Sequence, residues 1–170
     1  MGRCHAHLAL MQASIDLRQQ VIHLASALAD AGVENPRSEA WLLLEIATGR
    51  HRAELVSGAV NALEAAERQR LDALAARRLQ REPMAHLTGV REFWSLRFEV
   101  GPAVLVPRPD SETLIEAALA QIENRDAARR ILDLGTGSGC LLLSLLSALP
   151  AAQGLGVDRS AAALAIARSN

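Results

Sequence analysis

One glycine-rich stretch constrains the fold of this chain more than any other. An apolar run from Ile131 to Leu134 leads into residues 135–139, Gly-Thr-Gly-Ser-Gly, and a second apolar segment begins at Leu141. This order predicts a buried strand, a tight turn and a helix. Glycine permits a positive φ where the chain leaves the strand, and it lets a ligand or the next helix approach the backbone closely. The free N–H groups at the start of that helix can meet ligand acceptors.

A second predicted strand, from Gly154 to Asp158, ends in a carboxylate. In a βαβ unit, an acid about 20 residues beyond a glycine turn is placed to accept hydrogen bonds from ribose hydroxyls. The dinucleotide pattern G-x-G-x-x-G would need glycine where Cys140 stands, and the pattern is instead Asp-x-Gly-x-Gly-x-Gly from Asp133 to Gly139. A turn that only packs a helix on a strand remains the alternative.

The composition indicates a globular protein of one or two domains. The chain has 170 residues, 50% of them hydrophobic and 22% charged, with a net charge of −1. Such a charge argues against a nucleic-acid footprint, and no apolar run is long enough to span a membrane. Cys4 and Cys140 have no metal-ligand spacing, so we expect no metal and a reduced, cytoplasmic setting. Met11 is a possible alternative start that would leave the first residues as an extension.

Helical periodicity predicts an all-helical domain over residues 1–82. The predicted helices are residues 14–31, 36–49, 52–56 and 61–80, with Asn35 and residues 61–64 as caps.

From residue 84 to 106 the pattern changes to the alternation of strands, which predicts a β-hairpin within a linker over residues 83–108. We expect Phe93 and Trp94 to serve mainly in core packing. Beyond it, Asp110 or Ser111 is expected to cap a helix, and a last helix is expected at residues 161–168.

Three segments together resemble the HemK/PrmC family. They are residues 85–94 (Ala-His-Leu-Thr-Gly-Val-Arg-Glu-Phe-Trp), residues 104–112 (Val-Leu-Val-Pro-Arg-Pro-Asp-Ser-Glu) and the turn at 133–139. Members of this family are protein-(glutamine) amide-N methyltransferases that modify class I peptide-chain release factors. A sister family that methylates a ribosomal protein usually shows Pro-Arg-Ser-Pro where this chain has Pro-Arg-Pro-Asp, which favours the release-factor branch.

The resemblance implies an α/β fold in which residues 109–170 begin a Rossmann-like class I methyltransferase domain. Residues 1–82 would recognise the substrate protein, and Pro107 and Arg108 would line the cofactor pocket or hold the hairpin on it. Residues implied to bind S-adenosylmethionine are Gly135, Thr136, Gly137, Ser138, Gly139 and Asp158.

No residue of this chain receives a catalytic role from the resemblance. The family's Asn-Pro-Pro-Tyr motif, which holds and orients the glutamine amide, is not in the sequence. We therefore expect a fragment or a truncated gene model that is inactive alone and binds cofactor weakly. With neighbours missing, much of the helix at 141–149 is expected to face water.

Other functions stay open from the sequence. The same fold could act on a ribosomal-protein glutamine or on an adenine amine, or the helical domain could be a non-catalytic module that docks on a partner. A nicotinamide dehydrogenase is disfavoured by Cys140.

Overall fold

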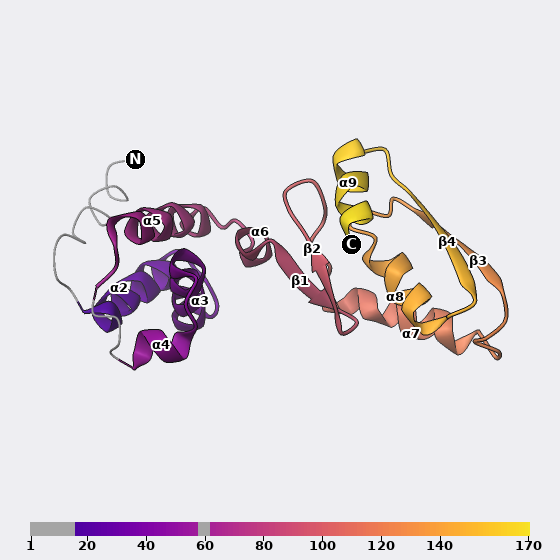
Figure 1. The fold of residues 1–170 in the computed structure, drawn as a ribbon, viewed down its shortest axis with the longest axis horizontal. Helices are drawn as coiled ribbons and strands as arrows, with labels where there is room; N and C mark the ends of the chain where they lie inside the picture. The colour runs from indigo at the N-terminus through magenta and orange to yellow at the C-terminus, as the bar shows by residue number, and fades with distance from the viewer. Residues whose placement is uncertain (1–15, 58–61) are drawn as a thin grey trace. The chain divides into compact units, whose positions relative to one another are not determined.

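The computed structural model describes residues 16–57 and 62–170, which form two compact units (Figure 1). The first unit ends at Leu87, and the second runs from Thr88 to Asn170. The predictions about Met11, Cys4 and Asn61 lie outside the described residues.

The first unit is helical, as the periodicity predicts. Its elements are α2 (Leu17–Asp30), α3 (Pro36–Thr48), α4 (Arg52–Val56), α5 (Ala65–Leu79) and α6 (Met84–Thr88), the last of which ends just inside the second unit. Helix α3 begins with Pro36 after the N-cap position of Asn35, and it ends at Gly49 with a φ of 69°. The start of α5 differs from the prediction, because the capping contact is made by Glu67, whose carboxylate accepts the N–H of Glu64 at 2.9 Å.

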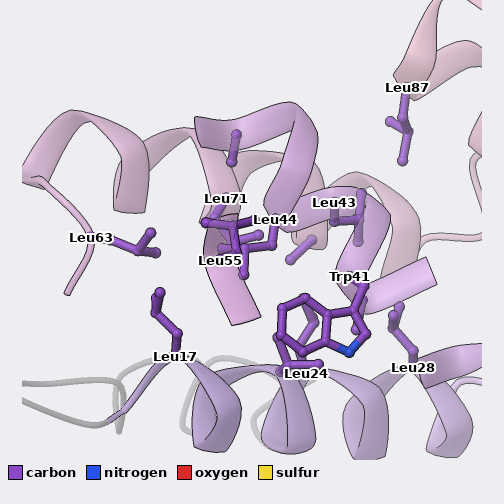
Figure 2. Packing of buried hydrophobic residues seen from close by; sticks show 14 of the residues in the cluster. Leu17, Leu24, Leu28, Trp41, Leu43, Leu44, Leu55, Leu63, Leu71 and Leu87 are labelled. Carbon is purple, nitrogen blue, oxygen red and sulfur yellow. The ribbon is translucent and has the colours of Figure 1, made fainter. Parts of the chain in front are cut away.

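Leucines from the helices of the first unit meet around Trp41 (Figure 2). Leu24 and Leu28 of α2 and Leu43 and Leu44 of α3 are buried in this cluster. Two polar contacts also connect these helices. Arg78 of α5 pairs with Glu39 of α3 at 2.5 Å, and the Arg52 guanidinium of α4 lies 5.0 Å from the centroid of the Trp41 ring. The first unit therefore has a hydrophobic core of its own.

The predicted hairpin opens the second unit. Strand β1 (Val90–Phe93) pairs antiparallel with β2 (Leu96–Glu99), and the rings of Phe93 and Phe98 are buried edge to face with centroids 6.4 Å apart. The hairpin is shorter than predicted, because the residues before it form helix α6, which begins at Met84 directly after Pro83.

The turn of the hairpin adopts an unusual backbone conformation. Trp94 and Ser95 have φ angles of 52° and 59°, a region that residues with a Cβ rarely adopt. The Trp94 N–H donates to Glu112 Oε1 at 2.9 Å, so α7 (Glu112–Ala120) holds this turn in place.

A parallel βαβ unit follows. It contains β3 (Arg129–Leu134), α8 (Cys140–Ala148), β4 (Ala152–Val157) and finally α9 (Ala161–Ser169); the short 3-10 helix η1 (Pro109–Ser111) precedes α7. Strands β3 and β4 are parallel, with Leu132 opposite Leu155 and Asp133 opposite Gly156. Ser111 occupies the N-cap position of α7 but makes no side-chain hydrogen bond there.

Helix α8 packs directly on one face of this two-stranded sheet. A Cβ added to Gly154 of β4 would lie 2.7 Å from Leu142 and 2.9 Å from Leu146. Because α8 also contacts α7, Ser147 is the only exposed residue between 141 and 149. The prediction that much of this helix faces water is therefore wrong.

The opposite face of the sheet is apolar and uncovered by any described residue. Leu132, Leu134, Leu155 and Val157 alternate onto this face with exposed fractions of 59%, 74%, 61% and 38%. The glycine turn thus follows a strand buried on one side only, which corrects the prediction of a fully buried strand. We call these four residues the open sheet face.

None of the described helices is long and apolar enough to cross a membrane. Within residues 16–57 and 62–170, no three His, Cys, Asp or Glu side chains are grouped to hold a metal ion.

Candidate functional site

The glycine turn leaves β3 and bends across the end of β4. Gly135, Gly137 and Gly139 have positive φ angles of 78°, 55° and 81°, as the pattern predicts for glycine at these positions. The N–H groups of Gly135 and Thr136 both donate to the carbonyl of Val157, at 2.8 and 3.0 Å. The turn is therefore fastened to the carboxyl end of β4, where ligands of open parallel sheets bind.

The glycines differ in what surrounds them. A Cβ on Gly139 would lie 3.2 Å from Leu143 and 3.6 Å from Ala167, so this glycine allows α8 and α9 to pack against the turn. A Cβ on Gly137 would meet only the carbonyl oxygen of Gly135, at 4.0 Å. The backbone at Gly137 therefore remains open to a ligand.

Asp158 lies against the glycine turn. Its carboxylate accepts the N–H of Ser160 at 2.9 Å through Oδ1 and the N–H of Gly137 at 3.0 Å through Oδ2. These backbone hydrogen bonds, that of Ser160 first, hold the pKa of Asp158 below its ordinary value, with a weaker contribution from the charge of Arg159. The carboxylate is ionised at neutral pH and keeps acceptor sites for further donors.

A second carboxylate borders the turn from the strand side. Asp133 Oδ2 accepts a hydrogen bond from the Thr136 hydroxyl at 2.7 Å. No ion pair among residues 16–57 and 62–170 engages Asp133 or Asp158. The rim of the turn is therefore acidic, which favours hydroxyl donors and cations and disfavours phosphate groups.

Cys140, the first residue of α8, is a free and partly buried cysteine. Burial raises the pKa of its thiol. It therefore stays protonated at neutral pH, and a thiol in that state is a poor nucleophile.

The structure brings together the residues that the sequence singled out. The six residues lie together at the carboxyl ends of β3 and β4. Gly135, Gly137 and Asp158 are accessible there, whereas Thr136, Ser138 and Gly139 are buried. In the segment 104–112, whose Pro107 and Arg108 were also expected near the cofactor, Pro107 is buried and Arg108 is exposed.

Sequence reasoning did not identify Asn170, although its amide donates to the carbonyl of Ser138 at 2.9 Å. An asparagine after a helix is common as a cap, so its type and position gave no distinctive signal.

Two family models match the chain. The model described as PrmC N-terminal domain matches residues 19–89, and the model described as methyltransferase small domain matches residues 110–170. The second match includes the glycine turn and Asp158.

Three curated relatives share the description release factor glutamine methyltransferase. The protein from Escherichia coli (strain K12) is 48% identical over 137 residues, which are 81% of this chain and 49% of the relative. That from Bordetella pertussis is 47% identical over 147 residues, 86% of this chain and 53% of the relative. That from Caulobacter vibrioides is 41% identical over 143 residues, 84% of this chain and 49% of the relative. The chain thus spans about half the length of the curated relatives it matches.

Proposed function

Because the chain belongs to the HemK/PrmC family of methyltransferases, we propose that it supplies the methyl-donor site of an enzyme that methylates a glutamine side-chain amide in a class I peptide-chain release factor. In this proposal the donor is S-adenosylmethionine. The residues that bind it are those of the turn at 135–139, together with Asp158.

The contact between Asp158 and Gly137 carries the proposal. A dinucleotide would bring its pyrophosphate to the N–H groups of such a turn. Here the Gly137 N–H already donates to a carboxylate, and Asp133 adds a second negative charge beside the turn. Repulsion disfavours a pyrophosphate at this position, whereas a nucleoside that carries a cationic sulfonium suits it.

Each part of the site has a defined task in this proposal. The backbone of residues 135–139 lies against the amino-acid portion of the cofactor, and the open side of Gly137 leaves room for it. The free acceptor sites of Asp158 hold the two ribose hydroxyls. Bound S-adenosylmethionine supplies an electrophilic methyl group for in-line transfer.

Positioning accounts for the remaining chemistry. An amide nitrogen is a weak nucleophile, because its lone pair is delocalised into the carbonyl, so the acceptor groups that orient it determine the rate. The Asn-Pro-Pro-Tyr motif that provides these groups in the family is not among the 170 residues. We therefore assign donor binding to this chain, and no catalytic residue.

The helical region would contribute substrate recognition. We propose residues 1–82 as a domain that grips the release factor, residues 83–108 as a linker, and residues 109–170 as the start of the methyltransferase domain. The separate hydrophobic core around Trp41 supports a domain that can present its surface independently. A release factor as substrate implies a cytoplasmic location.

Calorimetric titration tests the donor site. The purified chain is titrated separately with S-adenosylmethionine, S-adenosylhomocysteine and NAD. We expect both adenosyl ligands to bind, weakly, and NAD not to bind. Preference for NAD, or the absence of any adenosyl-ligand binding at millimolar concentration, would contradict the proposal.

A transfer assay with radiolabelled S-adenosylmethionine tests the assignment of catalysis elsewhere. Release factor, ribosomal protein and DNA are offered in parallel. The 170-residue chain is expected to label none of them, and labelling of the release factor would show that the chain holds catalytic groups we have not assigned.

A further inference from the structure

The side chain of Asn170 joins the hairpin to the glycine turn. Its amide nitrogen Nδ2 donates to the carbonyl of Ser138 at 2.9 Å and to the carbonyl of Glu99 at 3.1 Å. Its oxygen Oδ1 accepts the N–H of Glu99 at 2.6 Å. Glu99 is the last residue of β2, and Ser138 lies within the turn, so one amide connects two segments that are distant in the sequence.

A side-chain amide satisfies all three contacts of this arrangement. Both N–H donors of the amide are engaged, and its carbonyl is the acceptor for Glu99, so donors and acceptor are all needed. Aspartate would keep the acceptor but lose both donors, and its charge would face two carbonyl oxygens.

The contact falls on a part of the turn that is flanked by glycines. Ser138 lies between Gly137 and Gly139, and both glycines have positive φ angles. Glycine lowers the cost of alternative backbone conformations, so the peptide between Ser138 and Gly139 needs partners to keep one orientation. It has one at each end, because the Gly139 N–H donates to the Thr136 carbonyl at 2.8 Å and the Ser138 carbonyl accepts from Asn170.

We propose that Asn170 is a positioning residue that fixes the Ser138–Gly139 peptide against the hairpin and thereby sets the cofactor-binding shape of the turn. This inference rests on the proposed function for its effect on cofactor affinity. Its structural part concerns only the contacts of Asn170 with the turn and with β2.

Two substitutions separate the contacts of Asn170. Asn170→Ala removes all three hydrogen bonds, whereas Asn170→Asp keeps an acceptor for the Glu99 N–H and loses both bonds from Nδ2. Ser169→Ala is the matched control, because the neighbouring Ser169 hydroxyl donates only to the exposed Glu99 carboxylate, at 2.6 Å. Amide hydrogen exchange by NMR and the dissociation constant for S-adenosylhomocysteine are measured for each variant, with circular dichroism to verify folding.

The expected pattern is specific. Asn170→Ala accelerates exchange at both Glu99 and Gly139, and Asn170→Asp accelerates it at Gly139 alone. Both variants weaken S-adenosylhomocysteine binding by about tenfold, the effect of one lost hydrogen bond of ordinary strength. Ser169→Ala changes neither quantity. Should Asn170→Ala fail to fold, the contrast between Asn170→Asp and Ser169→Ala decides the question.

Wild-type exchange at Gly139 in Asn170→Asp, or an equal loss in Ser169→Ala, would overturn the positioning role. If the wild-type chain binds no adenosyl ligand while the exchange pattern is as expected, the proposed function fails and the structural role of Asn170 stands. If the wild-type chain binds the ligand and both Asn170 variants bind it equally well, the effect on the cofactor is wrong and the proposed function stands.

Discussion

Under the proposed function, Asp158 and the backbone N–H groups around it would determine what the glycine turn binds. The carboxylate is oriented from two sides by Ser160 and Gly137, so its free acceptor sites point in fixed directions before a ligand arrives. Fixed acceptors lower the ordering cost of binding.

Replacement of Asp158 by asparagine tests the proposed contact between the Asp158 carboxylate and the ribose hydroxyls. Asp158→Asn keeps the size of the side chain but removes the charge and one acceptor oxygen. Hydrogen bonds to charged groups contribute about 1.5–3 kcal/mol, so we expect S-adenosylmethionine binding to weaken by roughly 10- to 100-fold. Calorimetric titration measures the dissociation constant for S-adenosylmethionine. Asp126→Asn is the control, because Asp126 lies in the exposed segment before β3. Equal affinities in all three proteins would contradict the ribose assignment.

The lowered pKa of Asp158 predicts a pH dependence of stability. Because the folded-state pKa lies below that of the unfolded chain, the unfolded state binds the proton more readily as the pH falls. The stabilisation is complete above about pH 4, the ordinary range of the group, and is lost as the pH falls through the folded-state pKa. The free energies of unfolding of wild type and Asp158→Asn, measured in urea, should differ at pH 7 and converge as the pH falls below the folded-state pKa of Asp158. If the difference in unfolding free energy between the two proteins grew as the pH fell, the pKa of Asp158 would be raised in the folded state rather than lowered.

At the residue scale, sequence spacing identified the turn and Asp158 because a strand–turn–helix–strand order leaves few alternatives for where they meet. The contacts of Asn170 and Glu112 were not predicted, for a physical reason. Their partners are backbone groups of Ser138 and Trp94, and no residue pattern reveals which backbone group a side chain will reach.

At the scale of elements, the packing of α8 on β4 depends on the absence of a side chain at Gly154. Leu142 and Leu146 occupy the space that a Cβ would need, and Leu142 is buried. The sheet and the helix therefore approach each other more closely than a larger residue would allow.

Gly154→Ala is expected to destabilise the second unit by about 1–3 kcal/mol, the usual cost of inserting atoms into a packed interface. Denaturant unfolding measures the change. Gln153→Ala, at the exposed preceding position of the same strand, is the control and should change stability little. A neutral Gly154→Ala would mean that both leucines relax without loss of contact.

Helices and strands were predicted well where the apolar pattern repeats over several turns, and poorly where the segment is short. Helices α2 and α3 follow several turns of apolar spacing, so their ends were predicted within a few residues. Helix α6 has only five residues, too few for a period, and its residues were therefore included in the segment predicted as a hairpin. The Trp94-Ser95 turn was not predictable from residue type, because both residues adopt positive φ angles that their side chains disfavour.

At the scale of the whole molecule, the open sheet face brings together four of the exposed large apolar side chains of the second unit. Its four side chains lie on two paired strands, and such surfaces promote association. The sequence indicated that neighbours would be missing around this sheet but placed the exposure on α8. That assignment failed because α8 packs against β3, β4 and α7, so the exposure falls on the other face.

Charge on the open sheet face should reduce self-association. We expect Leu134→Lys to lower the sedimentation-average mass of the 170-residue chain, because its side chain is 74% exposed and can reach water without unfolding. Leu114→Lys is the control, because the side chain of Leu114 is 58% exposed and lies on α7 rather than on a sheet strand. If both variants have the same effect, the association does not involve the open sheet face.

The division at Leu87 has a consequence for heating experiments. Each unit has its own buried residues, so the chain should melt in two steps, and one midpoint temperature does not describe it. An adenosyl ligand at the glycine turn stabilises only the unit that binds it, by an amount that grows with ligand concentration. Differential scanning calorimetry should therefore show one peak that moves upward with added S-adenosylhomocysteine and another that stays in place. Movement of both peaks together would mean that the two units unfold as one.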